Sequence, residues 1–240
     1  MTASMVQLAA EAGKSFNAYL AVPSAPSGQA VVLLQEIFGI NANMRGIADE
    51  YAAEGYIAIA PDLFWRQRPG VQLDPNKPED RETAMSLMNG LDQTRAVDDA
   101  LLAATHVRSV PAFAGKMGAV GYCLGGKLAY LLAMRPGIDA AVSYYGVGIH
   151  GALDQASRLK CRILLHIAVK DQLCPPEAQA AIKQALTPLG NRVSIMVYPD
   201  SGHAFARRGG AGYDETAARR ADEATHQFLA LSEHSWESHP

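Results

Sequence analysis

The sequence predicts an α/β fold with a mostly parallel central sheet and helices on both faces. Short apolar segments recur along the 240 residues, and several are continuous and rich in β-branched residues. Such segments are typical of strands that are buried on both faces of a parallel sheet. They alternate with stretches that are long enough for helices, which is the pattern of repeated strand–helix units. Because no shift in composition marks a boundary, we expect a single domain over residues 1–240.

The first half of the chain contains three predicted strands and two helical regions. The strands are expected at residues 15–22, where alternation favours an antiparallel strand, and at 30–35 and 56–60. Asn41 is a suitable N-cap for a helix that continues to about Glu54, because Gly55 ends it. Three prolines and several charges predict a surface loop at 63–80, before a helical stretch at 80–108 that is broken near Gly90.

The second half of the chain continues the alternation of strands and helices. Strands are expected at residues 118–122, 140–145, 162–168 and 193–198. Helices are expected at residues 125–134, 176–186 and 214–231. The polar residues 234–240 are expected to fray, as chain ends commonly do.

The composition describes an ordinary globular chain and excludes several classes of partner. The net charge of −3 argues against a nucleic acid or a membrane surface, because both would favour a basic excess. No apolar run approaches the roughly 18 residues of a membrane span, and the first residues do not resemble a signal peptide. Three cysteines, Cys123, Cys161 and Cys174, suit free thiols in a reducing compartment. We therefore expect a cytoplasmic protein, and a monomer because no exposed amphipathic stripe stands out.

The strongest functional signal is the segment 121–126, with the sequence GYCLGG. It follows a predicted strand and opens a predicted helix, which is the context that a nucleophile elbow requires. Gly121 and Gly125 stand two residues before and after Cys123, where small residues relieve the steric conflict of a sharp turn. The positive end of the helix favours a thiolate, and the N–H of Leu124 can donate to an oxyanion. Taken alone, the segment also fits a glycine-rich turn around a buried structural cysteine.

An elbow nucleophile predicts an acid and then a histidine later in the chain. Asp171 follows the predicted strand 162–168, and His203 follows the predicted strand 193–198. This order matches the nucleophile–acid–base order of α/β-hydrolases. His203 would accept the thiol proton or stabilise the charge, and Asp171 would orient the imidazole. Three such residues at the right strand ends favour a catalytic triad over three unrelated loop residues.

No cofactor or metal ion is expected. The sequence holds neither a G-x-x-x-x-G-K-[ST] loop nor a strand–GxGxxG–helix unit, so nothing indicates a nucleotide cofactor. Cys161 and Cys174 lack the spacing of a metal site. Among the other histidines, His166 lies inside a predicted strand and is expected to be a core or hydrogen-bonded residue.

The chain has a cysteine at the elbow and five further short segments that match one family. It resembles the dienelactone hydrolase family (carboxymethylenebutenolidases), which belongs to the α/β-hydrolase superfamily. The segments occur in the order and spacing of the family through most of the chain, at residues 35–39, 60–63, 144–148, 170–171 and 202–205. The resemblance implies an α/β-hydrolase fold. It also implies that Glu36 lies beside Cys123 and holds the resting thiol in a less reactive state until substrate displaces the carboxylate. The N–H of Ile37 would complete the oxyanion hole with that of Leu124.

The resemblance further implies that Arg81 and Arg207 bind the carboxylate of the substrate. Planar guanidinium groups suit carboxylates, and two of them would select anionic lactones over neutral esters. Arg81 also fits a solvated surface residue, because it begins a polar helix. Apolar walls are expected from Phe38 and Tyr145, with Trp65 and Phe205 as further candidates, although core packing explains such aromatics equally well for Tyr145.

The expected activity is hydrolysis of a carboxylate-bearing enol-lactone, dienelactone to maleylacetate, in the degradation of aromatic compounds. Met85 and Met88 stand where the family carries large aromatics, which leaves the choice of lactone open and motivates an alternative. That alternative is a carboxylesterase or thioesterase of the same superfamily with a different small-molecule ester. A non-catalytic thiol-redox or ligand-binding protein is a third hypothesis, against which the presence of Asp171 and His203 weighs.

Overall fold

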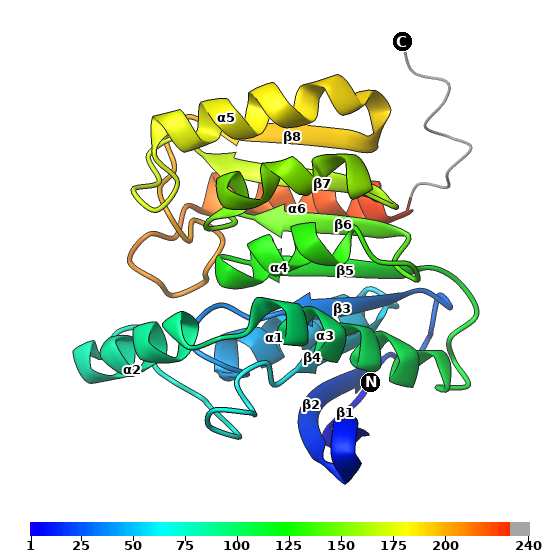
Figure 1. Cartoon of the computed structure of the whole chain (residues 1–240). Helices are drawn as coiled ribbons and strands as arrows, with labels where there is room; N and C mark the ends of the chain where they lie inside the picture. Colours follow the sequence, from blue (N-terminus) through cyan, green and yellow to red (C-terminus); the bar gives the residue numbers. More distant parts are fainter. Residues whose placement is uncertain (231–240) are drawn as a thin grey trace.

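The computed structural model describes residues 1–230, which form one eight-stranded sheet with helices on both faces (Figure 1). The strand order is β1-β2-β4-β3-β5-β6-β7-β8. The pairs β1–β2 and β2–β4 are antiparallel, and the pairs from β4 through β3 to β8 are parallel. The strands are β1 (Thr2–Ala9), β2 (Ser15–Val22), β3 (Ala30–Leu34), β4 (Ile57–Pro61), β5 (Met117–Tyr122), β6 (Ala140–Tyr144), β7 (Arg162–Ala168) and β8 (Val193–Tyr198).

Six α-helices and three short 3-10 helices complete the described part of the chain. The α-helices are α1 (Ala42–Ala53), α2 (Pro78–Asn89), α3 (Gln93–Arg108), α4 (Leu124–Leu132), α5 (Pro176–Leu186) and α6 (Glu215–Ala230). The 3-10 helices are η1 (Glu11–Gly13), η2 (Ile149–Arg158) and η3 (Thr187–Arg192). None of the described helices is both long and apolar enough to cross a membrane.

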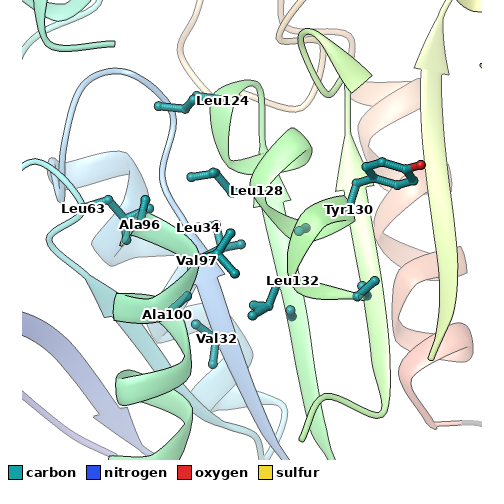
Figure 2. Close-up of a cluster of buried hydrophobic side chains, with 14 of the residues drawn as sticks. Val32, Leu34, Leu63, Ala96, Val97, Ala100, Leu124, Leu128, Tyr130 and Leu132 are labelled. Atoms are coloured by element: carbon teal, nitrogen blue, oxygen red, sulfur yellow. The ribbon is translucent and has the colours of Figure 1, made fainter. Parts of the chain in front are cut away.

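The two faces of the sheet carry separate apolar cores because successive strand residues point to opposite sides. In β3, Val32 and Leu34 face the core under α3, α4 and α5, whereas Val31 and Leu33 face the core under α1 and α6. Figure 2 shows the first of these cores, where side chains of β3 meet those of α3 and α4. All five residues of β3 are buried, which explains why this strand is continuously apolar.

The predicted alternation of strands and helices is confirmed. Asn41 caps α1 and accepts a hydrogen bond from the N–H of Met44 at 3.1 Å, and Gly90 separates α2 from α3. β1 was not predicted, because this edge strand is mostly exposed and lacks a clear alternation. The predicted fraying of residues 234–240 lies outside the described residues.

The topology places the loops after β3 and β5 next to each other. β3 is followed in the chain by β4 on one side of it, whereas β5 and the later strands extend to the other side. Ligands of open α/β sheets bind at such a switch point, outside the carboxyl ends of the strands. In Figure 1 the strands β3 to β8 point to the left, where α2 and the loop between β8 and α6 also lie.

Candidate active site

Cys123 occupies a strained turn between β5 and α4. Its φ of 55° lies in the left-handed region that side chains other than glycine rarely adopt. The turn depends on the two glycines that flank it. A Cβ on Gly121 would lie 1.9 Å from the carbonyl oxygen of Gly125, and a Cβ on Gly125 would lie 2.1 Å from that of Leu34. The predicted strand–turn–helix geometry is therefore present, and it requires glycine at both positions.

Backbone hydrogen bonds hold Cys123 in this conformation. Its N–H donates to the carbonyl of Tyr144 at 3.0 Å, and its carbonyl accepts from the N–H groups of Gly126 and Val147 at 3.0 and 3.1 Å. The residue is only 4% exposed. The backbone of the turn is thus fixed by its neighbours on β6 and α4.

His203 and Asp171 come together as the strand ends predict. His203 Nδ1 lies 2.8 Å from Oδ2 of Asp171, and Oδ1 of this buried carboxylate accepts from the N–H of Leu173 at 2.8 Å. Burial of the imidazole opposes its protonation, but hydrogen bonds and charge from Asp171 and Cys123 prevail and raise the pKa of His203 to about 10. The imidazole therefore interacts with both the Asp171 carboxylate and the Cys123 side chain.

Backbone strain is concentrated in this part of the fold. In residues 1–230, four residues other than glycine have a positive φ, and three of them are Cys123, Tyr145 at 38° and Ala204 at 61°. The ring of Tyr145 lies edge-on to His203, with the centroids 5.2 Å apart, and Ala204 follows His203 directly. Strained conformations persist where the surroundings enforce them, and they cluster at functional sites. The sequence contains no signal for the strain at Tyr145 or Ala204, because neither position holds a residue type that favours a left-handed backbone.

Glu36 and Arg207 form a buried two-point ion pair. Arg207 donates from Nε to Oε2 at 2.7 Å and from Nη2 to Oε1 at 2.9 Å, and the side chains are 16% (Arg207) and 4% (Glu36) exposed. The guanidinium also lies over the ring of Phe38, 5.1 Å from its centroid. Burial raises the pKa of Tyr145 well above its usual value, and the charges of Glu36, Arg207 and Cys123 also act on it. The ion pair, Tyr145 and Cys123 thus lie within electrostatic reach of one another.

The two amides expected at the oxyanion hole are brought to the same corner of the molecule. The N–H of Gly125 donates to the carbonyl of Gln35 at 3.0 Å, which ties the loop after β3 to the first turn of α4. Ile37 follows in that loop, and Leu124 is the first residue of α4. Within the described residues, neither N–H donates to a backbone carbonyl. The first amides of a helix have no acceptor inside the helix and are available to a ligand.

The other predicted site residues lie in different surroundings. Arg81 is exposed on α2, and its Nε donates to the carbonyl of Pro75, so its role as a carboxylate ligand stays a prediction. Met85 is also exposed on α2, and Met88 packs partly against the core. Trp65 is buried against the ring of Phe16, with the centroids 5.4 Å apart, which is core packing.

Buried aromatic and polar side chains support the site from below. Phe205 is fully buried, and its ring lies 5.4 Å from that of Tyr145. His166 is buried and hydrogen-bonded to the hydroxyls of Tyr198 at 2.8 Å and Thr225 at 2.9 Å, as its place in a strand predicts. Burial lowers the pKa of His166 to about 3, so this imidazole is neutral. Within residues 1–230, no group of three or more His, Cys, Asp or Glu side chains could hold a metal ion.

Comparison with known proteins identifies relatives over nearly the whole chain. The model of the dienelactone hydrolase family matches residues 16–232. A protein of Azospirillum brasilense assigned as a carboxymethylenebutenolidase is 42% identical over 221 residues, which cover 90% of this chain and 93% of that protein. The carboxymethylenebutenolidase of Pseudomonas putida is 38% identical over 220 residues, which cover 91% of this chain and 92% of that enzyme.

A solved structure agrees with these sequence relatives. The crystal structure of a protein assigned as a dienelactone hydrolase from Klebsiella pneumoniae superposes with a TM-score of 0.85 at 28% identity, and the match covers 96% of this chain and 99% of that chain. The strand order and the parallel core of the sheet are those of an α/β-hydrolase fold. The chain thus belongs to the dienelactone hydrolase family and is a carboxymethylenebutenolidase-like hydrolase.

Proposed function

We propose that the protein hydrolyses a carboxylate-bearing enol-lactone, dienelactone to maleylacetate, with Cys123 as nucleophile. The observation that carries the proposal is the buried ion pair of Glu36 and Arg207 beside the sulfur. A paired guanidinium next to a nucleophile offers a site where a substrate carboxylate can take the place of the protein's own carboxylate. The names of the relatives in Azospirillum brasilense and Pseudomonas putida indicate the same reaction.

Binding begins with an exchange of carboxylates at Arg207. The substrate carboxylate replaces Glu36 on the guanidinium, and Arg81 supplies a second contact from α2. Glu36 then leaves the space over Cys123, and the lactone carbonyl can approach the sulfur. Anionic substrates open the site in this way, whereas a neutral ester has no group to offer to Arg207.

Acylation uses the thiolate and the charged imidazole. The Cys123 sulfur attacks the lactone carbonyl, and the N–H groups of Leu124 and Ile37 stabilise the oxyanion. When the tetrahedral intermediate collapses, the ring C–O bond breaks and an enolate leaves. The proton of the His203 imidazolium goes to this enolate, which becomes a ketone, and the imidazole is left neutral.

Deacylation uses the neutral imidazole. His203, oriented by Asp171, takes a proton from water, and the hydroxide adds to the thioester carbonyl. Collapse of this intermediate breaks the C–S bond, which releases the carboxylic acid and restores the thiolate beside the imidazolium. The acid loses its proton to solvent as it leaves.

Turnover of cis- and trans-dienelactone, followed by ultraviolet absorbance beside a neutral nitrophenyl ester, tests the proposal. We expect rapid loss of a dienelactone, slower ester turnover, and no lactonase activity in a folded Cys123→Ala variant. Arg207→Ala and Arg81→Ala are each expected to raise KM for the anionic lactone. Full lactonase activity in the Cys123→Ala variant would refute the mechanism.

An esterase or thioesterase is the second candidate, because Arg81 and Met85 are exposed on α2 rather than packed around the nucleophile. Rapid turnover of esters without hydrolysis of dienelactones would favour this second hypothesis. The proposed roles of Cys123, Asp171 and His203 would be the same in both cases. In either case we propose that the chain acts as a monomeric single domain in the cytoplasm, and that the lactonase would serve the degradation of aromatic compounds.

A further inference from the structure

Arg207 and Arg208 are consecutive but face opposite sides of the loop between β8 and α6. Arg207 is paired with Glu36 beside Cys123, whereas Arg208 lines a cavity of about 640 Å³ between α1 and α6. Tyr122, the residue before Cys123, lines the same cavity. In two places, at Tyr122–Cys123 and at Arg207–Arg208, one residue lines the cavity and its neighbour in the chain belongs to the candidate active site.

On the cavity side, Arg208 joins the loop to two helices. Its Nη1 donates to Oε1 of Glu50 on α1, and its Nη2 lies 4.0 Å from Oδ2 of Asp222 on α6. Asp222 is itself fixed, because its Oδ1 accepts a hydrogen bond from the hydroxyl of Tyr144 at 2.9 Å. Arg208 is therefore anchored to the body of the fold.

The two arginines clamp the loop to the same part of the fold through different carboxylates. Glu36 lies in the segment between β3 and α1, and Glu50 lies within α1. If a substrate carboxylate takes the place of Glu36, Arg207 loses its tie to this segment. The Arg208 pair takes no part in that exchange, because its partners are Glu50 on α1 and Asp222 on α6.

We propose that Arg208 is a positioning residue that holds the loop in place while Arg207 exchanges Glu36 for the substrate carboxylate. The inference rests on the proposed function, in which Arg207 binds that carboxylate. Other ties of the loop do not reach α1. Ser201 donates to Asp214 at 2.7 Å within the loop, the N–H of Lys170 donates to the carbonyl of Ser201 at 3.0 Å, and His203 is bonded to Asp171 at 2.8 Å. These contacts hold the loop to itself and to the segment after β7, whereas Arg208 holds it to α1.

Arg208→Gln is the variant that tests this role. Its side chain is 58% exposed, and exposed ion pairs contribute little to folding, so we expect the variant to fold. We expect KM for dienelactone to rise about fivefold, the lower end of the coupling seen between two sites, with kcat changed less than twofold. Arg208→Lys keeps the positive charge beside Glu50 and Asp222 and is expected to recover most of the wild-type KM.

Arg219→Gln is the matched control, because Arg219 lines the same cavity and its removal lowers the net charge equally. Its ion pair is with Glu223 on its own helix, so it does not tie the loop to α1. An unchanged KM in this variant, together with the rise in Arg208→Gln, would support positioning. Equal KM increases in both variants would show a general charge effect and would overturn the proposal, as would an unchanged KM in Arg208→Gln.

A second measurement is independent of lactone turnover. The rate of alkylation of Cys123 by iodoacetate, divided by the rate with iodoacetamide, reports how well Arg207 attracts an anion to the sulfur. Peptide mass analysis separates Cys123 from the other two cysteines. We expect Arg208→Gln to lower this ratio about fivefold and Arg219→Gln to leave it unchanged. If the wild type does not hydrolyse dienelactone, the proposed function fails, and this ratio still decides whether Arg208 positions Arg207: an unchanged ratio in Arg208→Gln would refute that role.

Discussion

Glu36→Gln tests two roles of the Glu36–Arg207 ion pair, its contribution to the stability of the fold and its effect on the binding of anionic ligands. The substitution keeps the size of the side chain and removes its charge. Both side chains are largely buried, and Arg207 makes two hydrogen bonds of 2.7 and 2.9 Å to the carboxylate. The variant leaves the Arg207 charge without its partner, so we expect a less stable protein that binds anionic ligands more tightly.

The size of the effect follows from the burial of the pair. Removing one member of a buried ion pair costs about 3–5 kcal/mol, because the other charge remains buried. The amide oxygen of glutamine still accepts one hydrogen bond from Arg207, so we take the lower end, about 3 kcal/mol. In a chain of this size each kcal/mol lowers Tm by about 2–4 °C, which predicts a decrease of about 6–12 °C.

Thermal unfolding and ligand titration measure the two consequences together. A non-hydrolysable carboxylate analogue of the lactone is expected to raise Tm more in Glu36→Gln than in the wild type, because it binds the folded state without displacing a charged carboxylate. Arg207→Met is the control that removes the other partner and should abolish the response to the analogue. A Glu36→Gln variant with wild-type Tm and unchanged analogue affinity would refute the reasoning.

Four further predictions concern Cys123 and its neighbours. A hydrogen bond and charge from Cys123 help to raise the pKa of His203 to about 10, so NMR titration of Cys123→Ala should find a lower pKa for His203, and an unchanged value would exclude the contact. Because the pKa of His203 is higher in the folded protein than its ordinary 6.5, its stabilising effect is complete below pH 6.5 and should be lost as the pH approaches 10, which urea unfolding at several pH values measures. Asp171→Asn removes the carboxylate charge that orients the imidazole and stabilises its protonated form, and it should lower kcat by about 10²–10⁴-fold with the fold retained by circular dichroism; a loss below tenfold would contradict the triad. Gly125→Ala places a Cβ 2.1 Å from the Leu34 carbonyl and should destabilise the protein by about 3 kcal/mol or more in the same unfolding assay, whereas wild-type stability would show that the turn relaxes.

The elements and the elbow could be predicted because their signals are local. A glycine two residues before and after Cys123 is required by contacts within a single turn, and the buried strands are continuous runs of apolar residues. The positions of Asp171 and His203 followed from strand ends, since the carboxyl ends of parallel strands meet at one edge of the sheet. β1 was missed because an exposed edge strand carries neither continuous apolar character nor clear alternation.

The ion pair of Glu36 with Arg207 could not be predicted from the residues alone. The partners are 171 positions apart, and either could have faced solvent or the substrate. Arg207 was expected to bind a substrate carboxylate, but its pairing with a carboxylate of the protein itself was not predicted. Arg208 is exposed, and only the folded chain brings Glu50 and Asp222 to it.

If Arg207 binds the substrate carboxylate as proposed, selectivity lies in the cost of separating Arg207 from Glu36. Cys123 is buried, and the Glu36 and Arg207 side chains are 4% and 16% exposed. An anionic lactone replaces one carboxylate on Arg207 by another, and the guanidinium keeps a partner throughout. A neutral ester must separate Arg207 from Glu36 without replacing either, which leaves buried charges unpaired and carries the penalty estimated above for Glu36→Gln. In the proposed mechanism the Glu36–Arg207 pair would therefore disfavour neutral esters through the same contact that binds carboxylates, which combines a repulsive element with an attractive one.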